Sequence, residues 1–299
     1  MNNAPSETAA KAATTRDWGS AMKTVLVPTA PHDLMPATLE TALLLARRFD
    51  SYIEGFCLRP PLAEIVSVDM VMGLTWTGDE RADLDAEKHA RHLFETTMIE
   101  RDVRRDVGNP GGLSHRWLAD APAGDDFVGS QARVFDVTVL GRPGQRASGP
   151  RMTTFETVLF EGGRPILLAP PTAPATLGDA IVIAWNGSTE TAHAVAMGMP
   201  LLAKAARIMV LTVEGGMAPG PSGDQLARSL SRHGLPVEAK TIAPERRSTG
   251  EAILEFAAGY GCDLLVKGAY TQSRLRQMIF GGATSHILAQ ATIPVLMAH

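Results

Sequence analysis

Phe135-Asp-Val-Thr-Val-Leu-Gly141 and Cys262-Asp-Leu-Leu-Val-Lys-Gly268 are two versions of one pattern, in which an aspartate precedes a short apolar run that ends on a glycine. A continuous apolar run bounded by turn residues is typical of a strand buried on both faces, as in a parallel sheet covered by helices. The recurrence of the pattern within one chain predicts an internal duplication, which would set the architecture of the whole protein.

The starts and the ends of the two repeats also match. Thr24-Val-Leu-Val-Pro28 opens the first repeat and Ala180-Ile-Val-Ile-Ala184 opens the second, each followed by apolar residues at helical spacing. Arg164-Pro-Ile-Leu-Leu-Ala169 corresponds to Ile293-Pro-Val-Leu-Met-Ala298. Each repeat therefore begins and ends on an apolar strand, and the chain is expected to contain two copies of one unit.

This duplication divides the chain into a tail at 1–22, a first domain at 23–171 and a second domain at 179–299. We expect the tail to be flexible, because it has no apolar period. The first domain is longer by an extra loop and a long polar helix within 60–106. The apolar part of that insertion, at 60–78, either packs on the polar helix or the other repeat, or forms a lid or partner-binding loop.

In the second domain, apolar runs alternate with helical patterns. Strands are expected at 180–185, 207–213, 236–242, 263–267 and 294–298, and helices at 189–204, 222–233, 249–260 and 282–290. This alternation predicts an α/β fold with two doubly wound five-stranded parallel-sheet domains. The short apolar edge strands Pro165–Ala169 and Pro294–Ala298 are equivalent, so we expect them to pair and to arrange the domains as a pseudo-dimer.

Composition excludes several classes of protein. The net charge of −4, from 28 basic and 32 acidic side chains in 299 residues, argues against a general nucleic-acid binder. No apolar run approaches the roughly 18–20 residues that a membrane-spanning helix needs. Cys57 and Cys262 are too few for a disulfide framework or a zinc site and are best explained as small buried residues. We therefore expect a cytoplasmic protein with no metal site and no committed catalytic residue.

A glycine-containing segment follows the fourth strand of the second repeat, from Gly268 to Gly281-Gly282. Free N–H groups at the helix start near 282 favour an anion such as phosphate. The first strand ends at the same edge of the sheet, where open α/β sheets bind ligands. The candidate nucleotide-binding residues are Asn186, Gly187, Gly268, Gly281, Gly282, Thr284 and Ser285. An equally good interpretation is that the two glycines only break a turn and that Ser188 only caps a helix.

Taken in order and twice over, the opening strand, the Asp-Leu-Leu-Val-Lys-Gly strand, the glycine segment and the closing Ile-Pro-Val-Leu-Met resemble the universal stress protein family in its tandem two-domain form. The resemblance covers nearly all of 23–299. It implies the nucleotide-binding α-hydrolase-like fold with five-stranded parallel sheets. It also implies homodimers or intramolecular pairing of domains and, in some members, binding of ATP.

The ATP-binding members of that family carry G-x2-G-x9-G-[ST], which this chain matches in part. Gly268 and Gly281 take the first and third glycine positions, whereas Thr271 and Gly282 stand in place of the second glycine and the final hydroxyl residue. Thr284 fits the hydroxyl commonly found two residues later. The resemblance therefore makes the second domain the better nucleotide-site candidate.

Both first strands lack the acidic residue that usually follows in this family. Asn186 takes its place in the second repeat, and Thr29-Ala-Pro31 ends the strand in the first. After Arg142-Pro143-Gly144, the first repeat has Thr154 where the third glycine would stand. We therefore predict that the first domain is degenerate for nucleotide and mainly structural.

These residues lead to three hypotheses about the function. The leading hypothesis is a stress-response binding or signalling protein that holds ATP or a related adenine nucleotide in the second domain. The departures at Thr271, Gly282 and Asn186 motivate an alternative, a nucleotide-independent dimeric scaffold or interaction protein. A weaker alternative is a slow ATPase, in which His286 would be the general base.

Overall fold

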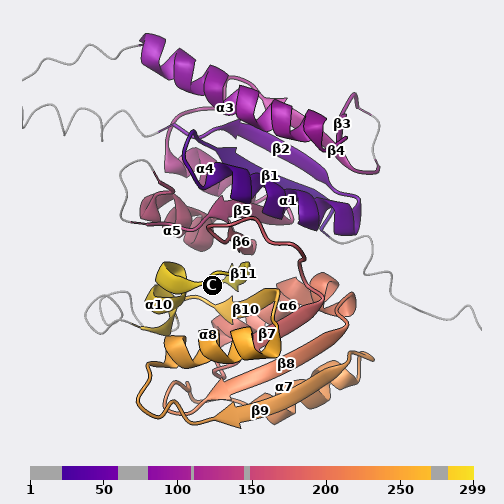
Figure 1. The fold of residues 1–299 in the computed structure, drawn as a ribbon, viewed down its shortest axis with the longest axis vertical. Helices are drawn as coiled ribbons and strands as arrows, with labels where there is room; N and C mark the ends of the chain where they lie inside the picture. Colours follow the sequence, from indigo (N-terminus) through magenta and orange to yellow (C-terminus); the bar gives the residue numbers. More distant parts are fainter. Residues whose placement is uncertain (1–21, 60–79, 109–110, 145–148, 271–281) are drawn as a thin grey trace, which may run out of the picture.

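The protein is one long sheet covered by helices on both faces (Figure 1). The structure is a computed structural model that describes residues 22–59, 80–108, 111–144, 149–270 and 282–299. Its strands are β1 (Thr24–Thr29), β2 (Tyr52–Cys57), β3 (Arg104–Arg105), β4 (Ser114–Leu118), β5 (Val137–Gly141), β6 (Ile166–Ala169), β7 (Ala180–Ala184), β8 (Arg207–Val213), β9 (Val237–Ile242), β10 (Leu264–Gly268) and β11 (Val295–Ala298). Its helices are α1 (Met35–Phe49), α3 (Glu80–Glu100), α4 (Asp125–Ala132), α5 (Met152–Glu161), α6 (Thr189–Ala203), α7 (Gly223–Ser231), α8 (Thr249–Tyr260) and α10 (Ala283–Gln290).

The described strands form a single eleven-stranded sheet in the order β3-β4-β2-β1-β5-β6-β11-β10-β7-β8-β9. Leaving out the two-residue strand β3, each half has the same order from its outer edge to the centre. The order is β4-β2-β1-β5-β6 in one half and β9-β8-β7-β10-β11 in the other. All pairs within a half are parallel. The predicted α/β fold is therefore confirmed.

The two halves join through one antiparallel pair of strands, β6 and β11 (Figure 1). Leu167 lies opposite Leu296 in the middle of this pair, and Ile166 and Leu168 lie opposite Met297 and Val295. Two equivalent strands that meet across a twofold axis must run in opposite directions. The predicted pairing of the last strands is confirmed, and it merges the two expected sheets into one.

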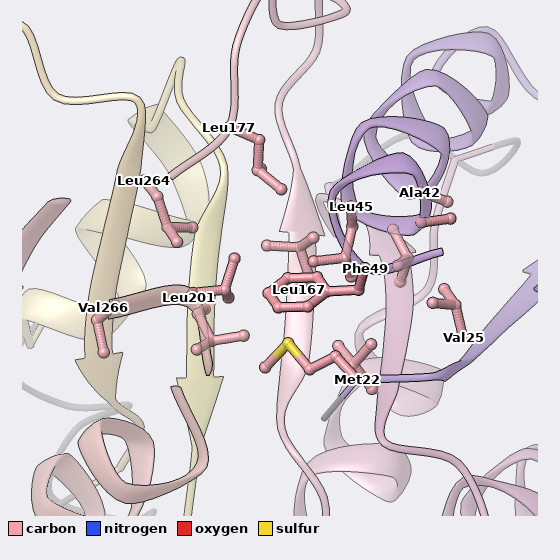
Figure 2. Packing of buried hydrophobic residues seen from close by; sticks show 14 of the residues in the cluster. Met22, Val25, Ala42, Leu45, Phe49, Leu167, Leu177, Leu201, Leu264 and Val266 are labelled. Atoms are coloured by element: carbon pink, nitrogen blue, oxygen red, sulfur yellow. The ribbon is translucent and has the colours of Figure 1, made fainter. Parts of the chain in front are cut away.

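Helices cover each face in a continuous layer that crosses the join. One buried cluster contains side chains from α1, α3, α6 and α7, and a second contains side chains from α4, α5, α8 and α10. In Figure 2, Leu167 lies between Phe49 on α1 and Leu201 on α6, which come from different halves. The core of each half is therefore completed by the other half, as expected for a large apolar contact rather than a hinge.

Arg48, near the end of α1, adds a polar clamp across the same join. Its Nη1 donates to Asp179 Oδ1 at 2.8 Å, and its Nη2 donates to the carbonyl oxygens of Gly178 at 2.9 Å and Lys204 at 2.7 Å. A planar guanidinium can hold several acceptors at once. This clamp fixes the start of β7 and the end of α6 against the first half.

Two sequence expectations need correction at their boundaries. Met22, placed at the end of the flexible tail, is only 3% exposed, and its carbonyl oxygen accepts a hydrogen bond from Ser51 Oγ at 2.6 Å. The long polar helix expected within 60–106 ends at Glu100, because Asp102 takes a left-handed conformation with φ of 54° and Arg104–Arg105 then join the sheet as β3. The apolar segment 60–78 and residues 1–21 lie outside the described residues.

Replacement of Leu167 by alanine tests the importance of the join. Leu167 is fully buried in the cluster that both halves share, so Leu167→Ala should lower the free energy of unfolding by about 2–5 kcal/mol in a urea titration. The matched control is Leu84→Ala on α3, where the side chain is 53% exposed and the change should stay within about 0.5 kcal/mol. Equal stabilities of the two variants would contradict the role given to this contact.

Candidate functional site

The candidate site of the second half lies where β7 and β10 end side by side. These strands are parallel neighbours, and β8 flanks β7 on its other side. Residues 185–188 lead from β7 into α6, and Gly282 precedes α10. Since α6 and α10 belong to opposite layers of the fold, the chain diverges here to the two faces of the sheet. This is the switch point at which open α/β sheets form a ligand crevice.

Asn186 organises the loop after β7. Its Oδ1 accepts hydrogen bonds from the backbone N–H of Ser188 at 3.2 Å and from Thr191 Oγ1 at 2.7 Å. Ser188 is the N-cap of α6, and its Oγ accepts from the backbone N–H of Thr191 at 3.3 Å. The interpretation of Ser188 as a helix cap is confirmed. The amide at the position of the family's acidic residue is therefore part of the loop's own hydrogen bonding.

Gly187 and Gly268 are required by close contacts within the chain. Gly187 has φ of 81°, and a Cβ there would lie 3.0 Å from the carbonyl oxygen of Ala218. At Gly268, a Cβ would lie 2.3 Å from the backbone nitrogen of Thr191 at the start of α6. Any larger residue would push β10 away from α6. Close packing within the chain is therefore enough to explain why glycine stands at these two positions, with or without a ligand.

Lys267 is a buried cation that the sequence analysis did not single out. Its Nζ donates to the carbonyl oxygen of Gly268 at 2.7 Å and to Thr284 Oγ1 at 2.9 Å. Burial lowers the pKa of this lysine to about 8, and the nearby carboxylate of Glu190 opposes part of that shift. The signal was present in the sequence as a single charge in the otherwise apolar strand Leu-Leu-Val-Lys-Gly.

A small cavity of about 40 Å³ lies beside Lys267, and Asn186, Trp185 and Ala283 are among its lining residues. The structure therefore brings together the loop after β7, the end of β10 and the first turn of α10. Gly282 is the N-cap residue of α10 and makes no side-chain cap bond, while Thr284 is buried against Lys267.

Ser285 and His286, both named from the sequence, do not line this cavity. Ser285 is exposed and lines a different hollow of about 720 Å³, whose other residues include Arg142 and Pro150 of the first half. His286 packs at the start of α8, where a Cβ on Gly250 would lie 2.7 Å from its own Cβ. Gly281 and Thr271 lie outside the described residues.

Comparison with known proteins gives a match over the second half of the chain. Residues 179–299 match the family model of the universal stress protein family. The second half of the chain, residues 179–299, is therefore similar to the universal stress protein family. Universal stress protein Slr1230 from Synechocystis sp. is 25% identical over 169 residues, which cover 54% of this chain and 57% of that protein. The chain thus spans little more than half the length of this curated relative.

Solved structures extend the likeness in fold over most of the chain. A universal stress protein from Archaeoglobus fulgidus DSM 4304 superposes with a TM-score of 0.70 at 15% identity, covering 94% of this chain and 98% of that one. A universal stress protein candidate from Pseudomonas aeruginosa UCBPP-PA14 superposes with a TM-score of 0.52 at 13% identity, with 94% of each chain covered.

In the described part of the chain, no helix has both the length and the apolar character needed to span a membrane.

The buried charge of Lys267 predicts a distinctive dependence of stability on pH. Its pKa in the folded protein is about 8, below the ordinary 10.5, so the folded state loses this proton first as the pH rises. Relative to a Lys267→Met variant, the parent should therefore gain about 2 kcal/mol of unfolding free energy between pH 7 and 9.5. Urea titrations at both pH values measure this difference.

The exposed lysine of β9 provides the control. Lys240→Met, which removes an exposed lysine from β9, is titrated alongside Lys267→Met as a control for the loss of a lysine. A Lys267→Met difference that is the same at pH 7 and at pH 9.5 would show that the ammonium group of Lys267 is not desolvated in the folded protein.

Proposed function

We propose that this protein is a stress-response binding or signalling protein that holds ATP or a related adenine nucleotide in its second half, with no committed catalytic group. The observation that carries the proposal is the meeting of Lys267, the Asn186 loop and the N-terminus of α10 beside one cavity at the switch point. Backbone N–H groups at a helix start and a nearby ammonium group are the donors that phosphate oxygens prefer.

Charged groups within the site have to attract the phosphate, because the chain as a whole has a net charge of −4. Lys267 is the buried cation of this edge and already lies within hydrogen-bond distance of Thr284 on α10. Its present acceptors are a carbonyl and a hydroxyl oxygen, both neutral. A phosphate oxygen would be a stronger partner for the ammonium group, since charge-assisted hydrogen bonds are about twice as strong as neutral ones.

The size of the cavity favours a second candidate, a nucleotide-independent scaffold. The described walls enclose about 40 Å³, whereas ligand pockets usually hold roughly 300–1,000 Å³. Asn186 Oδ1 and Thr284 Oγ1 already have partners within the chain. Nucleotide binding would therefore have to separate contacts that the protein makes with itself, which lowers affinity. One such contact joins Gly220 and Gly187. A Cβ on Gly220 would lie 2.2 Å from the carbonyl oxygen of Gly187.

We also propose that the first half is a second, diverged copy of the same domain, with the boundaries 23–171 and 179–299. The shared strand order of the two halves supports this proposal, and so does the family match, which starts at residue 179. The proposed slow ATPase activity has less support, because the side chain of His286 lies against Gly250 of α8 and is not among the described residues that line the cavity.

Calorimetric titration of the full chain with ATP, ADP and cyclic AMP separates the two candidates. The parent should bind at least one of them, and Lys267→Met should weaken that binding at least tenfold because it removes the buried cation. Lys240→Met, which removes an exposed lysine from β9, should bind like the parent. Absence of heat with all three nucleotides at 1 mM would reject nucleotide binding and leave the scaffold, whose oligomeric state light scattering then measures.

A further inference from the structure

The first half contains a larger cavity, at the corresponding edge of its own strands. Its volume is about 280 Å³, seven times that of the cavity beside Lys267. The lining comes from the residues that follow β1 and β2, the end of β5 and the start of α5, including Ala30, Leu58, Leu140 and Thr154. This volume is close to the lower limit of roughly 300 Å³ for small-molecule pockets. The switch point of the first half is therefore open where that of the second half is nearly closed.

Most of this lining is apolar. Met35, Leu140 and Phe155 are buried side chains, and Pro28, Pro31 and Pro150 add further apolar surface. Thr154 takes the position of the third glycine of the nucleotide motif. It is buried, and its Oγ1 donates to Asp125 Oδ1 at 2.6 Å. This wall therefore suits a hydrocarbon group better than a row of phosphates.

The charged side chains that line the cavity are both arginines, and no aspartate or glutamate is among its described lining residues. Arg151 is paired, because its Nη2 lies 2.7 Å from Asp125 Oδ1. Arg59 is held by a hydrogen bond from Nη2 to the carbonyl oxygen of Ala121. Its Nε is buried and has no hydrogen-bond partner among the described residues, which include no carboxylate paired with it. A buried donor on a cation without a partner is costly unless a ligand satisfies it.

His32, another residue that lines the cavity, adds a second donor. Its Nδ1 accepts a hydrogen bond from the backbone N–H of Leu34 at 3.2 Å. Burial lowers the pKa of this histidine, so the neutral ring carries its proton on Nε2. An N–H donor and a guanidinium beside an apolar chamber are complementary to an anion with an apolar body.

We propose that the first half binds a small carboxylic acid with an apolar chain or ring, its carboxylate at Arg59 and its apolar part among Leu140, Phe155 and Met35. The two oxygens of a carboxylate match the donor geometry of a guanidinium. Apolar burial adds affinity for each methylene group that leaves water. This site does not depend on nucleotide binding in the second half, and it gives the first half a ligand as well as a structural role.

Titration of the full chain with octanoate and with 1-octanol tests the proposal. The parent should bind octanoate at least tenfold more tightly than 1-octanol, which has the same chain without the charge. Arg59→Met should weaken octanoate binding at least tenfold and leave 1-octanol binding within twofold. Arg116→Met, which removes an exposed arginine from β4, should bind both compounds like the parent. Far-ultraviolet circular dichroism checks that each variant is folded.

A second variant keeps the test independent of Arg59. Ala30→Phe fills the cavity from a partly exposed loop position and should abolish binding of both compounds. Lys267→Met should bind octanoate like the parent, whatever it does to nucleotide. Absence of octanoate binding at 10 mM, or equal octanoate affinity in the parent and Arg59→Met, would overturn the proposal. Loss of octanoate binding in Lys267→Met would also overturn it, because it would place the ligand in the second half.

Discussion

Strand β6 runs antiparallel to β11, and Leu167 and Leu296 face each other at the centre of the pair. The rest of the fold depends on this contact, because each half would otherwise end in a short, wholly apolar edge strand. Such an edge invites pairing with another chain. Here the chain supplies the partner itself, and the helix layers close over the join with residues such as Phe49 and Leu201. Among the described strands, the outer ones are β3 and β9, which are more polar and more exposed.

The pairing of β6 with β11 places the switch points of the two halves in equivalent surroundings. The residues at each switch point then determine which ligand it can bind. Gly141 and Gly268 end β5 and β10, and a Cβ on either would lie 3.0 Å or less from the hydroxyl of a threonine on the neighbouring helix, Thr38 or Thr191. This shared packing keeps the strand and the helix together in both halves. Beyond it, the second half fills its crevice with Lys267, whereas the first half leaves an apolar chamber.

Much of this could be predicted from the sequence, because periodicity and repetition depend on local pattern. The strands and helices of the second half lie within about two residues of their expected positions, and Ser188 caps α6, as one interpretation of the sequence had it. The importance of Arg59 could not be predicted, and Lys267 was indicated only by its place as the single charge in an apolar strand. Lys267 is significant because it is buried, and Arg59 because one of its buried nitrogens lacks a partner among the described residues. Both properties arise only when distant segments pack.

The overall charge of −4 explains why each half needs its own cation. The net charge of the molecule does not attract a distant anion. Any electrostatic attraction therefore has to come from charged groups inside the crevice. The ammonium group of Lys267 and the guanidinium group of Arg59 respond differently to pH. The ammonium of Lys267 loses its charge as the pH rises through about 8, because burial lowers its pKa, whereas a guanidinium keeps its charge throughout that range. Anion binding that depends on Lys267 should therefore weaken above this pH, while anion binding that depends on Arg59 should not, and pH alone can assign a bound anion to one half.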